Sequence, residues 1–266
     1  MIGAIIGDIV GSRFEWDRIK TKEFDFLADN CFVTDDSIMT LAVAKALLEY
    51  SAQGEIPAQA AVRCMQGIGR PYPNCGYGLR FGEWMYSDDP QPYNSFGNGS
   101  AMRVSAVGWA ADSLEEVKAL SHAVTGVSHN HPEGLKGAEA TAVAIFLARA
   151  GKSQAEIKAY LQAHYYDLDF TLDEIRPDYQ FNEICQDTVP QALVAFLEAT
   201  SFEDAIRNAV SLGGDSDTLA AITGGIAEVY FGVPRIWYEE AVEFLNPHLR
   251  GIFAEVEEAW PTPILD

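Results

Sequence analysis

Two aspartates stand where a buried helix is predicted to begin. The stretch SLGGDSDTLAAITGG, residues 211–225, places Asp215 and Asp217 between a Gly-Gly pair and Thr218, and an apolar run follows at once. Side chains two residues apart point in nearly opposite directions on a helix, whereas an irregular turn at the glycines would let them converge. A helix cap needs one aspartate, so two aspartates and a threonine are more than a cap requires.

A second stretch offers the same chemistry. CFVTDDSIMTLAV, residues 31–43, places Thr34, Asp35 and Asp36 directly before another apolar helix. A cap again explains one aspartate and leaves the other. Because adjacent side chains diverge, Asp35 and Asp36 could each serve a different cation.

If the two helix starts meet in space, four carboxylates converge. Two unit charges about 4 Å apart repel each other by roughly 4 kcal/mol at an effective dielectric constant near 20, so such a group needs cations or protonation. Oxygen ligands favour Mg²⁺, Mn²⁺ or Ca²⁺, and the number of carboxylates suits two ions better than one. Zinc is disfavoured because no cysteine or histidine belongs to either acidic cluster, residues 34–37 or 215–218.

Composition restricts the classes of partner. The 266 residues include 18 Lys+Arg and 39 Asp+Glu, which gives a formal net charge of −21. The absence of a basic stripe argues against a nucleic-acid partner held by phosphate neutralisation, and against an anionic membrane surface. The four cysteines form no C-x-x-C pair, and Asp8 interrupts the apolar start of the chain. We therefore expect a cytoplasmic protein with free thiols, without a signal peptide or membrane span.

The elements that must position the carboxylates are predicted to be helices. Residues 37–54 carry a wide apolar face and end at Gly54, and Pro57 suits the first position of the next helix. Caps, prolines and glycines predict further helix boundaries at Ser113, Ser153, Ser201, Pro190 and Gly151, and apolar patterns predict helices over 216–231 and 235–246. Alternating strand patterns are nearly absent. We expect an all-α fold, with residues 1–266 forming one orthogonal helical bundle of about ten or more helices.

Two stretches do not fit a helix. Residues 71–100 are rich in Gly, Pro, Asn and Tyr, and residues 165–180 are acidic and aromatic. Long loops in a compact domain are usually functional. The segment FGNGSAMR, residues 96–103, could offer backbone N–H groups to a phosphate, although a lone Gly-rich loop is more often a turn. The segment SHNHPEG, residues 128–134, ends just before a helix and could face a cleft.

Taken in order, these motifs resemble those of the ADP-ribosylglycohydrolase family, the group of dinitrogenase-reductase-activating glycohydrolase. Six matching segments follow one another along most of the chain: GDIVGSRFE (7–15), TDDS (34–37), GNGSAMR (97–103), SHNHP (128–132), CQDTVPQAL (185–193) and GGDSDT (213–218). Any one of them alone would be weak, whereas six in order are a specific signal. Ser37 stands where the family has a threonine, and it keeps the hydroxyl.

The resemblance implies an all-α fold with two divalent ions at the mouth of a cleft, and cleavage at C1 of the ribose distal to adenosine. It implies six metal ligands: Thr34, Asp35, Asp36, Asp215, Asp217 and Thr218. Glu15 matches a family glutamate near the metals. The resemblance also implies contacts to ribose and diphosphate from four residues: Asn98, Gly99, Ser100 and His129. Phe96 or Tyr93, which flank the glycine loop, could stack on adenine.

The predicted function is that of a Mg²⁺- or Mn²⁺-dependent hydrolase that releases ADP-ribose from a modified protein or small molecule, with nucleic acid only as a modified substrate. Cleavage of a glycosidic bond builds oxocarbenium character on the ribose. Two ions could fix the ribose hydroxyls and lower the pKa of water, and Glu15, Asp36 or Asp217 would accept the proton. The acceptor could be an arginine, a serine, a nucleobase or a small molecule.

Two alternatives stay open. One keeps the fold without turnover, as a sensor that binds ADP-ribose or a nucleotide. The other is a structural helical protein in which the aspartates only cap helices. The complete set of acidic residues disfavours the sensor, because a sensor could lose a metal ligand freely.

Overall fold

The structure is a computed structural model that describes residues 1–266, apart from the side chain of Gln53. Its described residues form fifteen helices: α1 (Ile2–Ser12), α2 (Asp35–Gln53), α3 (Pro57–Gly69), α4 (Leu79–Tyr86), α5 (Gly99–Met102), α6 (Ser105–Ala110), α7 (Leu114–Thr125), α8 (Pro132–Arg149), α9 (Gln154–His164), α10 (Leu172–Ile175), α11 (Cys185–Leu197), α12 (Phe202–Val210), α13 (Ser216–Phe231), α14 (Arg235–Phe244) and α15 (Pro247–Ala259). Two short parallel strands, β1 (Val233–Pro234) and β2 (Ile264–Leu265), pair near the end of the chain. The expected all-α class is confirmed.

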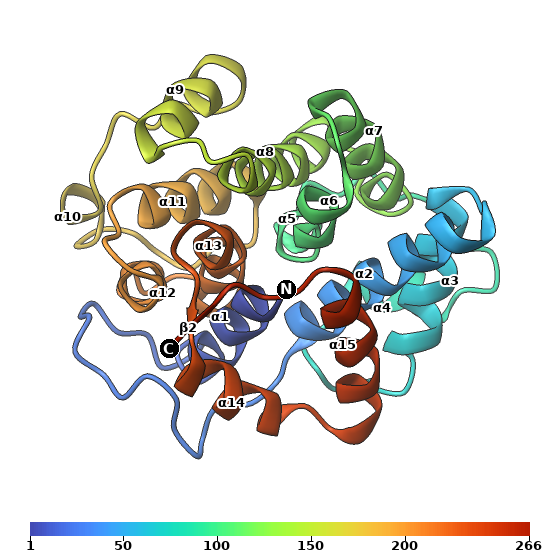
Figure 1. Cartoon of the computed structure of the whole chain (residues 1–266), viewed down its shortest axis with the longest axis horizontal. Helices are drawn as coiled ribbons and strands as arrows, with labels where there is room; N and C mark the ends of the chain where they lie inside the picture. The colour runs from blue at the N-terminus through green and yellow to red at the C-terminus, as the bar shows by residue number, and fades with distance from the viewer.

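Helix α13 lies at the centre of the bundle, with α1, α11 and α12 packed around it (Figure 1). Every residue of α1 is buried, and α13 is buried from Ser216 to Glu228. The two helices approach closely because α1 presents glycines to α13. A Cβ atom at Gly7 would lie 2.0 Å from the carbonyl oxygen of Ala220, and one at Gly11 would lie 2.4 Å from that of Ser216. This contact places the C-terminal end of α1 beside the start of α13.

Most helix boundaries follow local signals in the sequence. Helix α2 ends at Gly54 in the left-handed conformation, with φ 67°, and α3 begins at Pro57. The side chains of Ser113, Ser153 and Ser201 each accept a hydrogen bond from the backbone N–H three residues later, which satisfies an otherwise unpaired donor at a helix start. These predictions are confirmed.

The prediction that Pro190 starts a helix is wrong. Helix α11 begins at Cys185, and Pro190 lies inside it. The N–H of Cys185 donates to the carbonyl oxygen of Phe96 at 3.0 Å, so a contact with a distant segment supports the earlier start. Pro190 is the sixth residue of the helix, so the helix lacks the hydrogen bond that a backbone N–H at this position would donate to the carbonyl oxygen of Gln186.

The two stretches that were expected to lack helix each contain a short one. Helix α4 lies within residues 71–100 and buries Phe81, Trp84 and Met85 against the core. Helix α10 lies within residues 165–180, where a capping box between Thr171 and Glu174 begins it. Both are local departures from otherwise irregular segments.

Candidate metal centre

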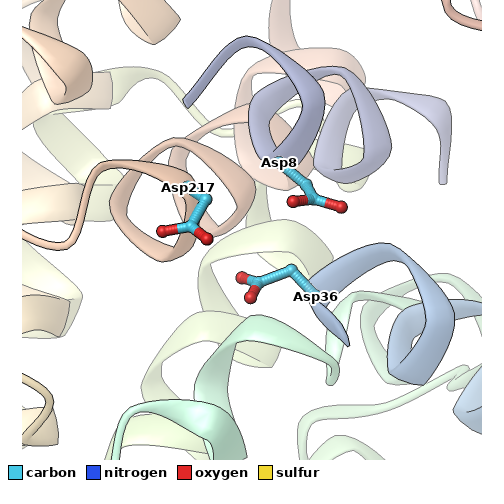
Figure 2. A group of neighbouring side chains, drawn as sticks. All are labelled: Asp8, Asp36 and Asp217. Carbon is cyan, nitrogen blue, oxygen red and sulfur yellow. The ribbon is translucent and has the colours of Figure 1, made fainter. Parts of the chain in front are cut away.

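Three helices bring carboxylates to one place. Asp8 comes from α1, Asp36 from the first turn of α2 and Asp217 from the first turn of α13, and their side chains point toward one another (Figure 2). One oxygen of each lies within 4.8 Å of the others. A second group, formed by Glu15, Asp215 and Asp217, meets the same limit. The two predicted helix starts therefore do meet.

Two oxygen atoms of this group have no hydrogen-bond partner in the described part of the chain. They are Oδ1 of Asp36 and Oδ1 of Asp217, and both are buried. Buried charged oxygens are normally paired or bound to a metal, because an unpaired buried charge is costly. Both atoms are thus available as ligands, and oxygen donors of this kind suit hard divalent cations such as Mg²⁺.

The electrostatics of the group also fit a bound cation. Burial raises the pKa values of Asp35, Asp36 and Asp217 well above the ordinary value, and the charges of neighbouring carboxylates raise them further. Burial likewise raises the pKa of Asp215 to about 6, although hydrogen bonds from its neighbours oppose that shift. Such a cluster carries its full negative charge at neutral pH only when positive charge is added.

Glu15 lies at the edge of the group, on the segment between α1 and α2. Burial, followed by the charges of Asp217 and Glu183, raises its pKa to about 7. Two nearby arginines are used elsewhere: Arg13 donates to the side-chain oxygen of Asn30 at 3.3 Å, and Arg18 donates to the backbone carbonyl oxygen of Glu15 at 3.3 Å. The Glu15 carboxylate therefore faces the aspartates without an arginine partner among the described residues.

Asp8 is the residue of this centre that the sequence analysis did not select. It accepts hydrogen bonds from the N–H groups of Thr34 at 3.0 Å and Ser37 at 3.1 Å, from Thr34 Oγ1 at 2.6 Å, and from the Ser37 hydroxyl. A carboxylate from α1 thus orders the first turn of α2 and the residues that lead into it. The sequence held two signals for Asp8, which interrupts the apolar run of residues 1–12 and belongs to the matching segment GDIVGSRFE.

In neither stretch does an aspartate side chain cap the helix that follows. Thr34 caps α2, because its hydroxyl accepts from the N–H of Asp36 at 3.2 Å. Asp215 occupies the N-cap position of α13 but makes no side-chain cap bond. Instead, its Oδ2 accepts from Asn98 Nδ2 at 2.7 Å, and the Asn98 amide also donates to Thr188 Oγ1 at 3.2 Å. Asn98 therefore orients Asp215.

The centre opens into a cleft of about 450 Å³. Glu15 lines this cleft, and so do all six predicted metal ligands: Thr34, Asp35, Asp36, Asp215, Asp217 and Thr218. Of the predicted substrate contacts, four also line the cleft: Tyr93, Asn98, Gly99 and His129. Arg103 also lines the cleft and was not selected from the sequence. The cleft therefore runs from the carboxylates to the glycine loop.

Two predicted substrate residues lie differently. The hydroxyl of Ser100 is buried and donates to the carbonyl oxygen of Gly97 at 3.0 Å. The ring of Phe96 packs against His131, with centroids 5.1 Å apart, and Phe96 is not among the residues that line the cleft. Contacts of Phe96 and Ser100 with a ligand stay predictions.

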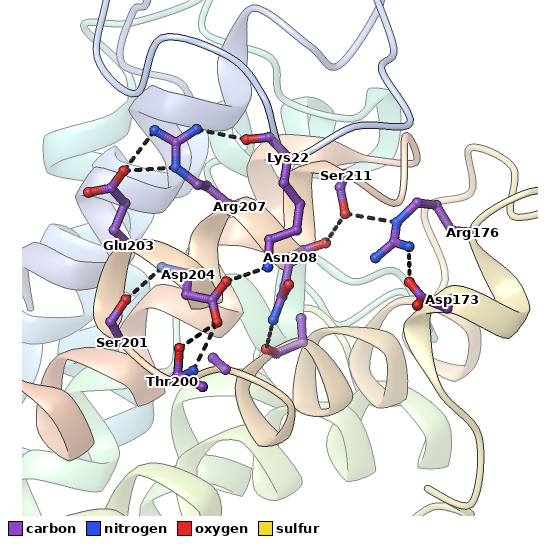
Figure 3. Close-up of polar contacts among 12 residues, drawn as sticks. Lys22, Asp173, Arg176, Thr200, Ser201, Glu203, Asp204, Arg207, Asn208 and Ser211 are labelled. Carbon is purple, nitrogen blue, oxygen red and sulfur yellow. Dashed lines mark hydrogen bonds and ion pairs between the residues drawn. The ribbon is translucent and has the colours of Figure 1, made fainter.

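The segment that carries Glu15 is fastened to α12 (Figure 3). Lys22 forms an ion pair with Asp204, and Arg207 donates to the carbonyl oxygens of Lys22 at 2.8 Å and Phe24 at 2.7 Å. The Arg207 guanidinium also lies 4.8 Å from the centroid of the Phe24 ring, within the range of a cation–π contact. These contacts hold residues 22–24 of the segment against the helix that packs on α13.

The chain matches a known protein family over almost its whole length. A family model described as ADP-ribosylglycohydrolase matches residues 1–260. The chain belongs to the ADP-ribosylglycohydrolase family. The resemblance seen in the six sequence motifs is thereby confirmed.

Several ADP-ribosylglycohydrolase relatives are similar over most of their length. The chain is 25% identical to ADP-ribosylhydrolase ARH3 of Mus musculus, covering 96% of this chain and 91% of that protein. It is 26% identical to ADP-ribosylarginine hydrolase Tri1 of Pseudomonas putida (strain GB-1), covering 98% of this chain and 77% of that protein. A solved structure described as an ADP-ribosylglycohydrolase-related protein complex has a TM-score of 0.68 at 22% identity, covering 97% and 95% of the two chains, which shows a shared fold.

Among the described residues, no helix combines the length and the apolar character that crossing a bilayer demands.

Proposed function

We propose that this protein is a metal-dependent hydrolase that cleaves the glycosidic bond between ADP-ribose and an acceptor, and so releases ADP-ribose. Membership of the ADP-ribosylglycohydrolase family supports the hydrolysis of ADP-ribosyl groups in general. One observation carries the metal dependence: buried carboxylates from three helices converge at one end of a cleft, and two of their oxygens have no partner in the described chain. Capping alone does not require that convergence.

Six residues would hold two Mg²⁺ or Mn²⁺ ions: Thr34, Asp35, Asp36, Asp215, Asp217 and Thr218. When bound, such ions supply positive charge that orients ribose hydroxyls and makes water more acidic. Asp8 and Asn98 hold this set in place, since Asp8 orders the start of α2 and Asn98 orients Asp215.

Glu15 is the residue best placed to accept the proton of the attacking water. Its carboxylate lines the cleft beside Asp215 and Asp217, and it projects from an irregular segment rather than from a helix. A positioned carboxylate contributes about 10²–10⁴-fold as a general base. Asp36 and Asp217 were also considered as proton acceptors, and their unpartnered oxygens suit the role of metal ligand better.

The cleft also carries positive charge, which suits the diphosphate. Arg80 and Arg103 line it, and Gly99 presents no side chain, which lets backbone approach a ligand. These cations oppose the overall charge of −21 at the place where a phosphate must bind. ADP-ribose would thus lie with its diphosphate toward the arginines and its distal ribose toward the carboxylates.

A panel of ADP-ribosylated substrates tests this proposal. Arginine- and serine-linked peptides, a modified nucleobase and O-acetyl-ADP-ribose are each incubated with the protein, with and without Mg²⁺, and released ADP-ribose is measured. We expect release from at least one substrate, and only with metal. If ADP-ribose binds but no substrate is cleaved, the sensor alternative is favoured and the proposed activity is wrong.

A further inference from the structure

Arg103 is a buried cation in the wall of the cleft. It is 1% exposed, and the carbon of its guanidinium lies 5.0 Å from the centroid of the Phe81 ring. Its Nε and Nη1 atoms have no hydrogen-bond partner among the described residues. Taking an arginine out of water without a paired anion is costly. The role of Arg103 is therefore read from the hydrogen bonds that it does make.

The contacts of Arg103 run to His129 through Ser128. Nη2 of Arg103 donates to Ser128 Oγ at 2.8 Å, and Ser128 Oγ lies 2.9 Å from Nδ1 of His129. Nη2 itself lies 3.4 Å from the same ring nitrogen. The Arg103 guanidinium and the Ser128 hydroxyl thus both meet Nδ1 of His129.

The direction of these hydrogen bonds follows from the chemistry of arginine. A guanidinium has donors only, so Ser128 Oγ must accept from Arg103, and its own hydrogen is free to point at His129. Both neighbours of Nδ1 therefore bring a hydrogen to it. Nδ1 must accept, and in a neutral imidazole the single hydrogen then resides on the other nitrogen, Nε2.

We propose that Arg103, acting through Ser128, is a positioning residue that holds His129 as the neutral tautomer with its hydrogen on Nε2. Nε2 faces the glycine loop of the cleft, because Cβ atoms built on Gly97 and Gly99 would lie 3.5 and 3.6 Å from it. Nε2–H is thus a fixed donor beside the place assigned to the diphosphate of the substrate. That last step rests on the proposed function, whereas the tautomer itself does not.

The surroundings of the ring agree with a neutral state. Burial lowers the pKa of His129 well below its ordinary value, and the charges of Arg103 and Arg80 lower it further. Tyr93 packs edge-on against the ring, with centroids 5.5 Å apart. A protonated ring would place a third positive charge among these groups, and it would have to turn an N–H toward two donors.

Nuclear magnetic resonance of the full chain labelled with ¹⁵N-histidine tests the tautomer without substrate. The His129 signals are assigned by their loss in His129→Gln. We expect the wild type at neutral pH to show a neutral ring protonated on Nε2. Ser128→Ala and Arg103→Met should give mixed tautomers, whereas Arg80→Met, which removes a nearby charge but no hydrogen bond to His129, should keep the wild-type pattern.

Binding of ADP-ribose provides the second readout. Loss of a fixed donor to a charged group should raise the dissociation constant for ADP-ribose about tenfold or more in Ser128→Ala, which leaves both arginines of the cleft in place. Ser128→Ala is the milder change and keeps the test valid if Arg103→Met does not fold. A wild-type ring protonated on Nδ1 or on both nitrogens overturns the proposal, as does a normal tautomer in folded Ser128→Ala and Arg103→Met. Absence of hydrolysis with the predicted tautomer contradicts only the proposed function.

Discussion

The contact between α1 and α13 makes a prediction that links packing to the metal centre. Among the glycines of α1, Gly11 is the one whose added Cβ atom would meet Asp217 of that centre. A Cβ atom at Gly11 would lie 2.4 Å from the carbonyl oxygen of Ser216 and 2.5 Å from the Cα atom of Asp217. Ordinary contact begins at 3.4 Å, so Gly11→Ala must push the start of α13 away by about 1 Å. The atoms in the way belong to the backbone and cannot rotate aside.

The magnitude follows from two opposing effects. Overpacking of a core costs about 1–3 kcal/mol, and the rigid backbone contact places Gly11→Ala toward the upper end. Alanine favours a helix over glycine by about 1 kcal/mol, which offsets part of that cost. We expect the free energy of unfolding to fall by about 2 kcal/mol. Because misplacement by about 1 Å can cost on the order of 10²-fold in activity, ADP-ribose release should fall further than stability alone explains.

Gly225→Ala is a matched control on α13. Its Cβ atom would lie 3.4 Å from Ser105 Cβ and 3.6 Å from Ala4 Cβ, which is ordinary contact. This variant should be as stable as the wild type or more stable by up to about 1 kcal/mol. Urea denaturation measures stability, and titration with Mg²⁺ measures metal affinity. If Gly11→Ala matches Gly225→Ala in both measurements, the account of how α1 positions Asp217 is wrong.

Three further substitutions test single residues of the cleft. Asp217→Ala should lose at least one bound ion and the activity. Its metal-free form should be no less stable than the metal-free wild type, because removal of a carboxylate relieves repulsion. An unchanged metal content, measured by elemental analysis, would contradict the ligand assignment. Glu15→Gln should lower kcat about 10²-fold or more with little change in the dissociation constant for ADP-ribose, and wild-type turnover would exclude the role of base. Gly99→Val should weaken ADP-ribose binding, measured by calorimetry, more than it lowers Tm, because its side chain would extend toward His129 Nε2; a collapse of stability with normal binding by the folded fraction would make the loop only a turn.

Local signals predicted the fold well. Gly54, Pro57 and the capping serines act on the backbone within a few residues, so their effect can be predicted from the adjacent sequence. The predicted helix start at Pro190 was wrong because the first residue of α11, Cys185, forms a hydrogen bond with Phe96, which is far away in the chain. Helix α4 was missed because its glycines and aromatic residues resemble a loop until its buried face meets the core.

Some residues of the candidate site could likewise be predicted from the sequence, and others could not. The carboxylates that could bind a metal, such as Asp35 and Asp217, could be selected from their residue types and their place at the start of a predicted helix. The residues that orient them could not, because each acts across a large separation. Asp8 binds the residues that begin α2, and Asn98 reaches Asp215 from another segment. Only the packing of α1 against α2, and of the glycine loop against α13, brings these partners together.

The most direct test of the central claim is a metal titration of the activity. The protein is stripped with a chelator, and Mg²⁺ is added back in steps while bound ions and released ADP-ribose are measured on the same sample. The structure predicts an inactive stripped protein whose activity returns as ions bind, up to about two per chain, as expected for this number of carboxylate ligands. Release of ADP-ribose that persists after stripping, or a protein that binds no ion, would contradict the claim that the buried carboxylates form a catalytic metal centre.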